Sequence, residues 1–268
     1  MTTTFFHFSD FHILPGKDLT REEGNPCNKI EQIIGIAEET GIRPSFSIIT
    51  GDISQEGSQT GYDIAKEYIS RIESLGGPVI PVVGNVDGRR RFRENLLRKP
   101  ASDAPCYYTE KVDDTRIIVL DSQAPGEVTG ALQGEQLDWL ENQLKHGTEP
   151  TLIAFHHPPF TVYLPNGGTH NVFEPRDAER LQQIVKHGNV VAVLCGHLHQ
   201  SLITRREGVN YVVGPAVLSE SLLSTKESKT YDSSGFTIHT LHGDNLTTRP
   251  VIYSEGRSLI STTPHVPN

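Results

Sequence analysis

Short runs of apolar residues alternate along the chain with longer stretches that carry apolar side chains at helical spacing. The apolar runs predict buried strands at residues 3–10, 45–52, 78–85, 115–122, 151–159 and 189–200. The stretches between them predict amphipathic helices at residues 27–41, 61–77, 134–147 and 174–188. Strands that alternate with helices favour a mostly parallel sheet that is covered on both faces.

Beyond residue 200 the pattern changes to shorter strands, predicted at residues 201–208, 210–217 and 235–243. The segment 218–235 is rich in serine and charged residues, and we expect it to form a flexible loop. Because no linker or internal repeat interrupts the chain, the pattern favours a single domain. This domain spans residues 1–268, with a core over about 4–217 and C-terminal strands and a loop over 218–268.

Polar residues follow five of the predicted strands, at the point where each strand ends. In a mostly parallel sheet, ligands collect at the carboxyl ends of the strands. These polar residues supply carboxylate, amide and imidazole groups but no thiolate, a mixture that suits zinc, manganese, iron or cobalt. The clusters are Asp10-Phe11-His12, Gly51-Asp52, Gly84-Asn85, His156-His157 and Gly196-His197-Leu198-His199.

The spacing within these clusters also favours metal binding. Asp-x-His and His-x-His place two side chains on the same side of an extended chain, so that both can reach a metal. Seven donors are too many for one tetrahedral site and suit two ions that share a carboxylate. Each motif alone is more often a turn or a helix cap. The five together, each after a strand, favour metal ligation over coincidence.

Composition limits the classes of partner. The net charge of −9 over 268 residues repels nucleic-acid backbones, so we expect no long nucleic-acid partner. No apolar run approaches the roughly 18 residues that cross a membrane, and the N-terminus has no signal-peptide pattern. Of the cysteines Cys27, Cys106 and Cys195, one would be left over from any disulfide, which favours a reducing compartment. We therefore expect a cytoplasmic protein without a membrane partner.

The order Asp-x-His, Gly-Asp, Gly-Asn, His-His-Pro-Pro and Gly-His-x-His resembles the calcineurin-like metallophosphoesterase superfamily. Residues 120–144, LDSQAPGEVTGALQGEQLDWLENQL, are similar to the branch of class III cyclic-nucleotide phosphodiesterases and glycerophosphodiesterases. The resemblance covers roughly residues 4–217. It implies a four-layer α/β/β/α sandwich with a two-metal site at the strand ends. Spacing alone would not separate that fold from a simpler doubly wound sheet.

The resemblance also implies a role for each motif. Three terminal ligands would hold each of two divalent ions, and one carboxylate would bridge the ions. The ligands are Asp10, His12 and His199 for the first ion and Asn85, His156 and His197 for the second, with Asp52 as the bridge. His157 would pack beside them. Manganese, iron, zinc and cobalt all remain open, and a homodimer is an oligomer that relatives often form.

The corner after the third predicted strand departs from the family pattern. Family members read Gly-Asn-His-Asp or Gly-Asn-His-Glu there, and that His is thought to protonate the leaving oxygen or to steady the phosphate. This chain reads Gly84-Asn85-Val86-Asp87, and valine can neither donate, accept nor titrate. Asp87 loses its usual partner. We expect Asp87 to cap the helix that begins near Arg89, where the helix dipole favours a carboxylate.

Three functions are compatible with these residues. The first and favoured one is a phosphodiesterase that hydrolyses a small phosphodiester, such as a cyclic nucleotide or a glycerophosphodiester, through a hydroxide that bridges two metals. The second is a weakened, metal-bound module that binds a phosphorylated ligand or a protein. The third is a metal-dependent hydrolase of non-phosphate esters or lactams, which the lack of a His-x-His-x-Asp-His run disfavours.

In the favoured function, Asp52 and Asn85 serve catalysis as ligands. A general acid contributes roughly 10²–10⁴-fold in rate, so its loss at Val86 would slow the reaction without abolishing it. His170, in the loop after His-His-Pro-Pro, is a candidate to replace the missing acid, although an exposed loop histidine is the commoner case.

Overall fold

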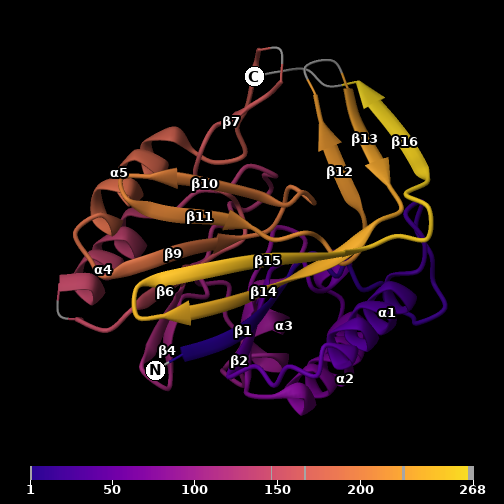
Figure 1. Cartoon of the computed structure of the whole chain (residues 1–268), viewed down its shortest axis with the longest axis horizontal. Coiled ribbons are helices and arrows are strands. Elements are labelled where there is room, and N and C mark those ends of the chain that lie inside the picture. Colours follow the sequence, from indigo (N-terminus) through magenta and orange to yellow (C-terminus); the bar gives the residue numbers. More distant parts are fainter. Residues whose placement is uncertain (1, 146, 166, 225–226, 265–268) are drawn as a thin grey trace.

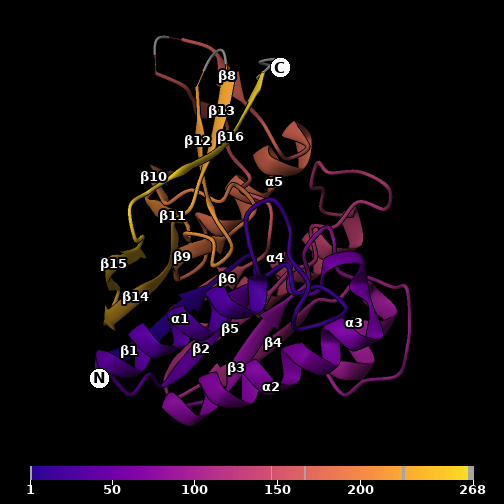
Figure 2. The same cartoon turned by 90° about the vertical axis from the view of Figure 1, so that its right-hand side faces the viewer.

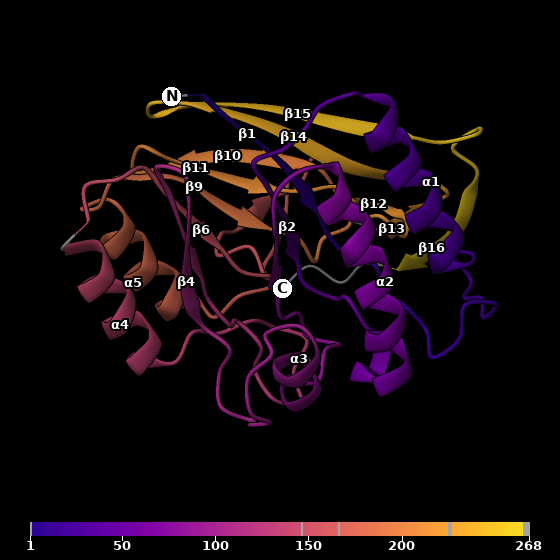
Figure 3. The same ribbon diagram turned by 90° about the horizontal axis from the view of Figure 1, so that it is seen from below.

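Two β-sheets pack face to face in the centre of the molecule, and helices cover both outer surfaces (Figure 1). The computed structural model describes residues 2–145, 147–165, 167–224 and 227–264. Within these residues the layers run helix, sheet, sheet, helix, as seen from below (Figure 3). The four-layer α/β/β/α sandwich expected from the family resemblance is therefore confirmed, and the simpler doubly wound sheet is excluded.

The first sheet has the strand order β15-β14-β1-β2-β3. Strands β1, β2 and β3 are parallel neighbours, whereas β14 pairs antiparallel with β1 and β15 pairs antiparallel with β14. The late strands β14 and β15 thus belong to the same sheet as the first strand, β1. The bounds are β1 (Thr2–Phe8), β2 (Phe46–Thr50), β3 (Val79–Val82), β14 (Ser234–His242) and β15 (Asn245–Tyr253).

The second sheet has the strand order β10-β11-β9-β6-β5-β4. Its inner strands are parallel, and β10 and β4 pair antiparallel at the two edges. The bounds are β4 (Tyr108–Val112), β5 (Thr115–Val119), β6 (Thr151–Ala154), β9 (Val190–Cys195), β10 (Leu202–Arg206) and β11 (Val209–Val213).

Four helices of the described residues lie where the amphipathic pattern places them, and a further one begins at Arg89, as expected. The first sheet is covered by α1 (Pro26–Glu39), α2 (Gln59–Leu75) and α3 (Arg89–Asn95), and the second by α4 (Gly134–Lys145) and α5 (Pro175–Val185). The start of α1 shows how local sequence sets a boundary. Asn25 accepts a hydrogen bond from the Asn28 N–H, and Pro26 occupies the first helical turn, where its missing N–H costs nothing.

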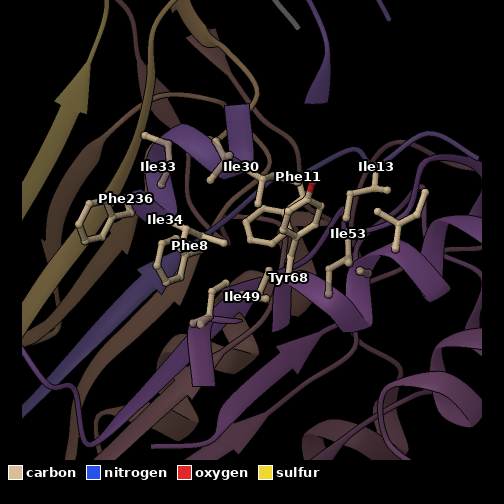
Figure 4. Close-up of a cluster of buried hydrophobic side chains, with 14 of the residues drawn as sticks. Phe8, Phe11, Ile13, Ile30, Ile33, Ile34, Ile49, Ile53, Tyr68 and Phe236 are labelled. Carbon is tan, nitrogen blue, oxygen red and sulfur yellow. The ribbon is translucent and has the colours of Figure 1, made fainter. Parts of the chain in front are cut away.

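Alternate side chains of each strand fill different cores. Phe8 and Ile49 face the helices, where they join Ile30 of α1 in one buried cluster (Figure 4). Phe5 and Ile48 face the opposite sheet and belong to the core between the sheets. Burying such a side chain stabilises the fold by about 1.5–3 kcal/mol. Because a slip of one residue would exchange the two sets, packing on both faces fixes the register and so the position of every strand end.

The C-terminal region departs from the sequence prediction. Residues 218–235, expected to be a flexible loop, instead contain most of a three-stranded sheet that stands above the sandwich (Figure 2). Its strands are β12 (Glu220–Leu223), β13 (Glu227–Tyr231) and β16 (Leu259–Pro264). These strands are polar and only partly buried. They form by backbone pairing, and their sequences show no alternation of apolar and polar residues from which they could be predicted. The partly exposed edge strands β4 and β15 were missed for the same reason.

Among the described residues, the helices are too short or too polar to serve as membrane-spanning segments.

Candidate metal centre

Five loops, each following a strand, bring seven polar side chains to one place in the fold. The loop after β1 carries Asp10 and His12, and the loop after β2 carries Asp52. The remaining donors follow β3, β6 and β9, and they are Asn85, His156, His197 and His199. The two sheets present the carboxyl ends of these strands to the same corner. The sequence-predicted ligands are therefore neighbours in space, although almost 190 positions separate Asp10 from His199.

One group of donors converges around Asn85. The His156 Nε2 atom lies 3.0 Å from Asn85 Oδ1, 3.2 Å from His197 Nδ1 and 3.3 Å from Asp52 Oδ2. The distance from His197 Nδ1 to Asn85 Oδ1 is 3.1 Å. Metal–ligand bonds of about 2.0–2.2 Å in tetrahedral geometry place donor atoms about 3.4 Å apart. This group has the spacing that a single divalent ion requires.

A second group converges on the other side of the same carboxylate. The His12 Nε2 atom lies 3.1 Å from His199 Nε2 and 3.7 Å from Asp52 Oδ2. The His199 Nε2 atom lies 3.5 Å from Asp10 Oδ1. The Asp52 Oδ2 atom thus belongs to both groups of donors. This is the arrangement that a bridging ligand between two ions would need.

Hydrogen bonds on the far side of two imidazoles leave their inner nitrogens ready to bind metal. The Nδ1 of His156 lies 2.7 Å from the Thr50 carbonyl oxygen, which can only accept, so Nδ1 carries the hydrogen. The Nδ1 of His12 lies 2.8 Å from Gln55 Oε1. Second-shell partners of this kind set the tautomer of metal-ligating histidines. With the hydrogen of the neutral ring on Nδ1, each Nε2 faces the centre and can offer its lone pair to a cation.

The backbone at the centre is strained. Of the seven candidate ligands, five have positive φ values, between 49° and 70°: Asp10, His12, Asp52, His197 and His199. A non-glycine residue in this region costs of order 1–3 kcal/mol and clusters at functional sites. Gly84 is required by close approach, because a Cβ there would lie 2.1 Å from the Asp52 backbone nitrogen. The loops therefore give up backbone stability in order to aim these side chains at one point.

The carboxylates and imidazoles shift one another's pKa values. Burial alone would raise the pKa of Asp10, but the neighbouring His199 and His156 rings outweigh it and lower that pKa to about 2. Burial alone would lower the pKa of His156, but the Asp52 and Asp10 carboxylates raise it to about 9. Burial, reinforced by His156, lowers the pKa of His197 to about 3. The site therefore holds fixed negative charge, with a proton on His156, where an ion would bind.

Asp87 does not cap α3, contrary to the sequence prediction. The N-cap of α3 is Gly88, and no side-chain hydrogen bond caps the helix. The buried Asp87 carboxylate turns inward and accepts hydrogen bonds from four donors: the N–H groups of Ile53, Ser54 and Gly84 and the Tyr62 hydroxyl. Four buried hydrogen bonds outweigh a helix-dipole interaction of about 0.3–1 kcal/mol. Asp87 thus joins the loop that carries Asp52 to the loop that carries Asn85.

Val86 contributes through its backbone. Its N–H donates to Asp52 Oδ1 over 3.0 Å. This bond helps to fix the orientation of the carboxylate, whose other oxygen, Oδ2, faces both groups of donors. The side chain of Val86 is half-buried and adds no polar group to the site.

Gln123 is a supporting residue that the sequence did not reveal. Its Nε2 donates to the carbonyl oxygens of Gly84, Asn85 and Asp87, at distances of 2.8–3.2 Å. A buried ion pair between Arg89 and Asp121, with a shortest distance of 2.8 Å, lies beside it, and Arg89 also donates to the Gln123 carbonyl oxygen. Gln123 lies within the stretch that resembles the family branch, which was the available signal.

Two further histidines have distinct positions. His157 is buried, with its Nδ1 2.8 Å from Ser122 Oγ and its ring centroid 4.4 Å from that of His197. Its ring nitrogen also lies close enough to those of His156 and His197 for the three to share an ion, so the role of His157 as a packing residue stays a prediction. His170 lies in a short hairpin of β7 (Val162–Tyr163) and β8 (Thr169–His170), paired with Val162. Within the described residues it is in none of the groups of side chains close enough to share an ion, and its role as an acid stays a prediction.

The sequence model of the calcineurin-like phosphoesterase family matches residues 3–201. The chain belongs to this family. The resemblance drawn from the motifs is confirmed, and the protein is a metal-dependent phosphoric ester hydrolase of a family that uses divalent metal ions.

Relatives and a solved structure agree with this assignment. The chain is 30% identical over 216 residues to a Synechococcus protein named "Probable cyclic nucleotide phosphodiesterase syc0937_d". The aligned region covers 81% of each of the two chains. It is 27% identical over 209 residues to the glycerophosphodiester phosphodiesterase GpdQ of Enterobacter lignolyticus, covering 75% of this chain and 71% of the relative. The fold is similar to purple acid phosphatase PPD1 from yellow lupin, with a TM-score of 0.62, 16% identity, and coverage of 93% of this chain and 51% of that one.

The proton on His156 predicts that metal uptake is coupled to pH. An incoming ion must displace this proton, so the affinity for Mn²⁺ should increase as the pH rises towards about 9. Because the folded pKa of His156 lies above its ordinary value of 6.5, the same proton stabilises the metal-free protein below pH 6.5. That contribution is lost as the pH rises to about 9.

Calorimetric titration with Mn²⁺ at neutral pH, in buffers of different ionisation enthalpy, measures the protons released. His156→Ala should release fewer protons than the wild type. Equal heats in all buffers for the wild-type protein would contradict the proposed protonation of His156.

The inward orientation of Asp87 predicts a large effect of Asp87→Asn. The new amide group would face N–H donors, and each buried group left without a partner costs about 1–3 kcal/mol. We expect the free energy of unfolding to fall by about 2–4 kcal/mol in urea titrations of the metal-free protein. The matched control is Asp103→Asn, an exposed residue paired with Arg90, which should change stability by less than about 1 kcal/mol. Similar effects of the two substitutions would refute the role given to Asp87.

Proposed function

We propose that this hydrolase is a two-metal phosphodiesterase acting on a small phosphodiester, such as a cyclic nucleotide or a glycerophosphodiester. The observation that carries the proposal is the position of Asp52 Oδ2, which belongs to both groups of donors. Divalent ions at such a site lower the pKa of water and offset negative charge on phosphoryl oxygens. The names of the relatives support the substrate class.

The residues of the chain would each have a definite task. Asp10, His12 and His199 would hold one ion and Asn85, His156 and His197 the other, with Asp52 between them. The Val86 N–H would keep the Asp52 carboxylate turned towards both ions. The Thr50 carbonyl would keep the imidazole of His156 in the metal-binding tautomer. Manganese, iron, zinc and cobalt all suit this mixture of oxygen and nitrogen donors. A cytoplasmic location and a homodimer stay predictions from the sequence.

Val86 would bias the enzyme towards diesters. A monoester dianion places more negative charge at the centre than a diester monoanion does, so it gains more from a polar, positively polarised histidine. Valine at this position removes that group and leaves an apolar side chain, against which the second substituent of a diester could pack. The half-buried state of Val86 beside Asn85 is compatible with such a contact.

The shared carboxylate predicts unequal effects of two ligand substitutions. Asp52→Ala should remove both ions, because each group of donors loses a member, whereas His12→Ala should spare the ion held by the Asn85 group. Elemental analysis of each variant after reloading with Mn²⁺ and desalting would count the ions. Asp103→Ala, at an exposed position, is the control and should keep the wild-type content. Equal metal loss from Asp52→Ala and His12→Ala would argue against a bridge.

Restoring the family histidine at Val86 should change substrate preference. Val86→His should raise the rate on esters with poor leaving groups by roughly 10²-fold, the lower end of the range for a general acid, and should shift the ratio of monoester to diester turnover upward. An aryl phosphate, whose leaving group needs little protonation, should gain little. Val86→Leu, which adds bulk without a polar group, is the control and should leave the ratio unchanged.

The wild type and both variants would be assayed with saturating Mn²⁺ on one panel of esters. An unchanged ratio in Val86→His, together with equal wild-type rates on both substrate classes, would disprove the link to Val86. No turnover by any of the three proteins would favour the weakened, metal-bound module instead.

A further inference from the structure

A loop outside the predicted ligand set reaches the back of the metal centre. Arg21 and Gly24 exchange two backbone hydrogen bonds, of 2.9 and 3.1 Å, that close a tight turn. Gly24 adopts a φ of 108°, which other residues rarely tolerate. The turn directs the Arg21 side chain to Gln55, and Nη1 of Arg21 donates to Gln55 Oε1 over 2.7 Å. The Arg21 Nε donates to Glu23 over 3.2 Å, which holds the guanidinium in place.

The same oxygen of Gln55 contacts a predicted metal ligand. Gln55 Oε1 lies 2.8 Å from His12 Nδ1 as well as 2.7 Å from Arg21 Nη1. A carbonyl oxygen has two lone pairs and can accept both bonds. The Gln55 backbone is itself fixed, because its N–H donates to the Ile13 carbonyl over 2.9 Å. Only the side-chain amide of Gln55 is left to choose between two orientations.

Arg21 fixes the orientation of the Gln55 amide because a guanidinium can only donate hydrogen bonds. If the Gln55 amide turned over, its NH₂ group would face the Arg21 N–H, and two donors would oppose each other. With Arg21 present, Oε1 must face His12, so His12 Nδ1 must carry the hydrogen and Nε2 must present a lone pair. Without Arg21, a flipped Gln55 could donate to His12 Nδ1. The ring would then place its N–H at Nε2, where the ion belongs.

We propose that Arg21 is a positioning residue that locks His12 in the metal-binding tautomer by fixing the amide orientation of Gln55. The inference rests on the proposed two-metal site and adds to it a residue outside the ligand motifs. Arg21 touches neither substrate nor ion in this role. It acts through the hydrogen bonds from Arg21 to Gln55 and from His12 to Gln55.

The sign of the effect on metal affinity separates this role from simple electrostatics. Arg21 is a cation near a site for cations, so by charge alone its removal should tighten metal binding. If Arg21 instead fixes the His12 tautomer, its removal should weaken metal binding. Loss of a second-shell partner typically costs 10–100-fold in metal affinity, and we expect a loss of this size for Arg21→Met at one of the two sites, measured by calorimetry with Mn²⁺.

A second substitution provides the matched control. Glutamate at position 55 can only accept when ionised, so Gln55→Glu would hold His12 in the same tautomer whether or not Arg21 is present. Arg21→Met should therefore have little effect in a Gln55→Glu background, a non-additivity that a double-mutant cycle measures. Arg21→Lys keeps a donor and should restore part of the affinity. Arg249→Met, at an exposed position on β15, makes the same charge change and should leave Mn²⁺ affinity unchanged.

The tautomer itself can be observed in the metal-free protein. Nitrogen-15 NMR of the histidine side chains, at mildly alkaline pH, distinguishes a hydrogen on Nδ1 from one on Nε2. We expect His12 to carry its hydrogen on Nδ1 in the wild type and to gain the Nε2 form in Arg21→Met. An unchanged His12 signal in Arg21→Met, or tighter Mn²⁺ binding, would overturn the proposal. A wild-type protein that bound no divalent ion would instead overturn the proposed function, and the His12 signal would still test the lock.

Discussion

The geometry of the metal centre depends on the orientation of the Asp52 carboxylate, whose two oxygens contact different groups. Asp52 Oδ1 accepts the Val86 N–H, and Oδ2 is left between the Asn85 group and the His12 group. Asp87 and Gln123 maintain this orientation because their hydrogen bonds to backbone groups hold the loops after β2 and β3 in place. If either loop moved, Asp52 would face only one group of donors.

The rest of the fold keeps these loops in place under strain. Left-handed backbone at Asp10, Asp52 and His197 is unfavourable in isolation. It persists because each loop continues directly from a buried strand whose register is fixed on both faces by packing. The same arrangement explains why loops separated by more than 100 residues can place nitrogen and oxygen atoms about 3 Å apart.

Much of this could be predicted from the sequence, because motifs such as Asp-x-His and His-x-His mark the polar ends of buried strands. Their backbone is left-handed, however, and not extended as expected from their spacing. Most strands and helices of the sandwich are also visible as apolar periodicity, apart from the edge strands β4 and β15. What could not be predicted depends on contacts between distant segments. Asp87 was expected to cap the helix after it, whereas its partners come from the loop after β2 and from Tyr62. Gln55 belongs to no motif, and Gln123 lies in the stretch that resembles the family branch without a role assigned to it; the roles of both come from the atoms that they contact. The strands β12 and β13 lack apolar alternation and form by backbone pairing.

The central claim is that Asp52 lies between two metal ions, and anomalous X-ray scattering from crystals soaked in Mn²⁺ tests it most directly. We expect two anomalous peaks about 3.5–4 Å apart. One should lie among Asp10, His12 and His199 and the other among Asn85, His156 and His197, with Asp52 Oδ2 bound to both. A single peak at saturating Mn²⁺, or two peaks of which only one contacts Asp52, would contradict it.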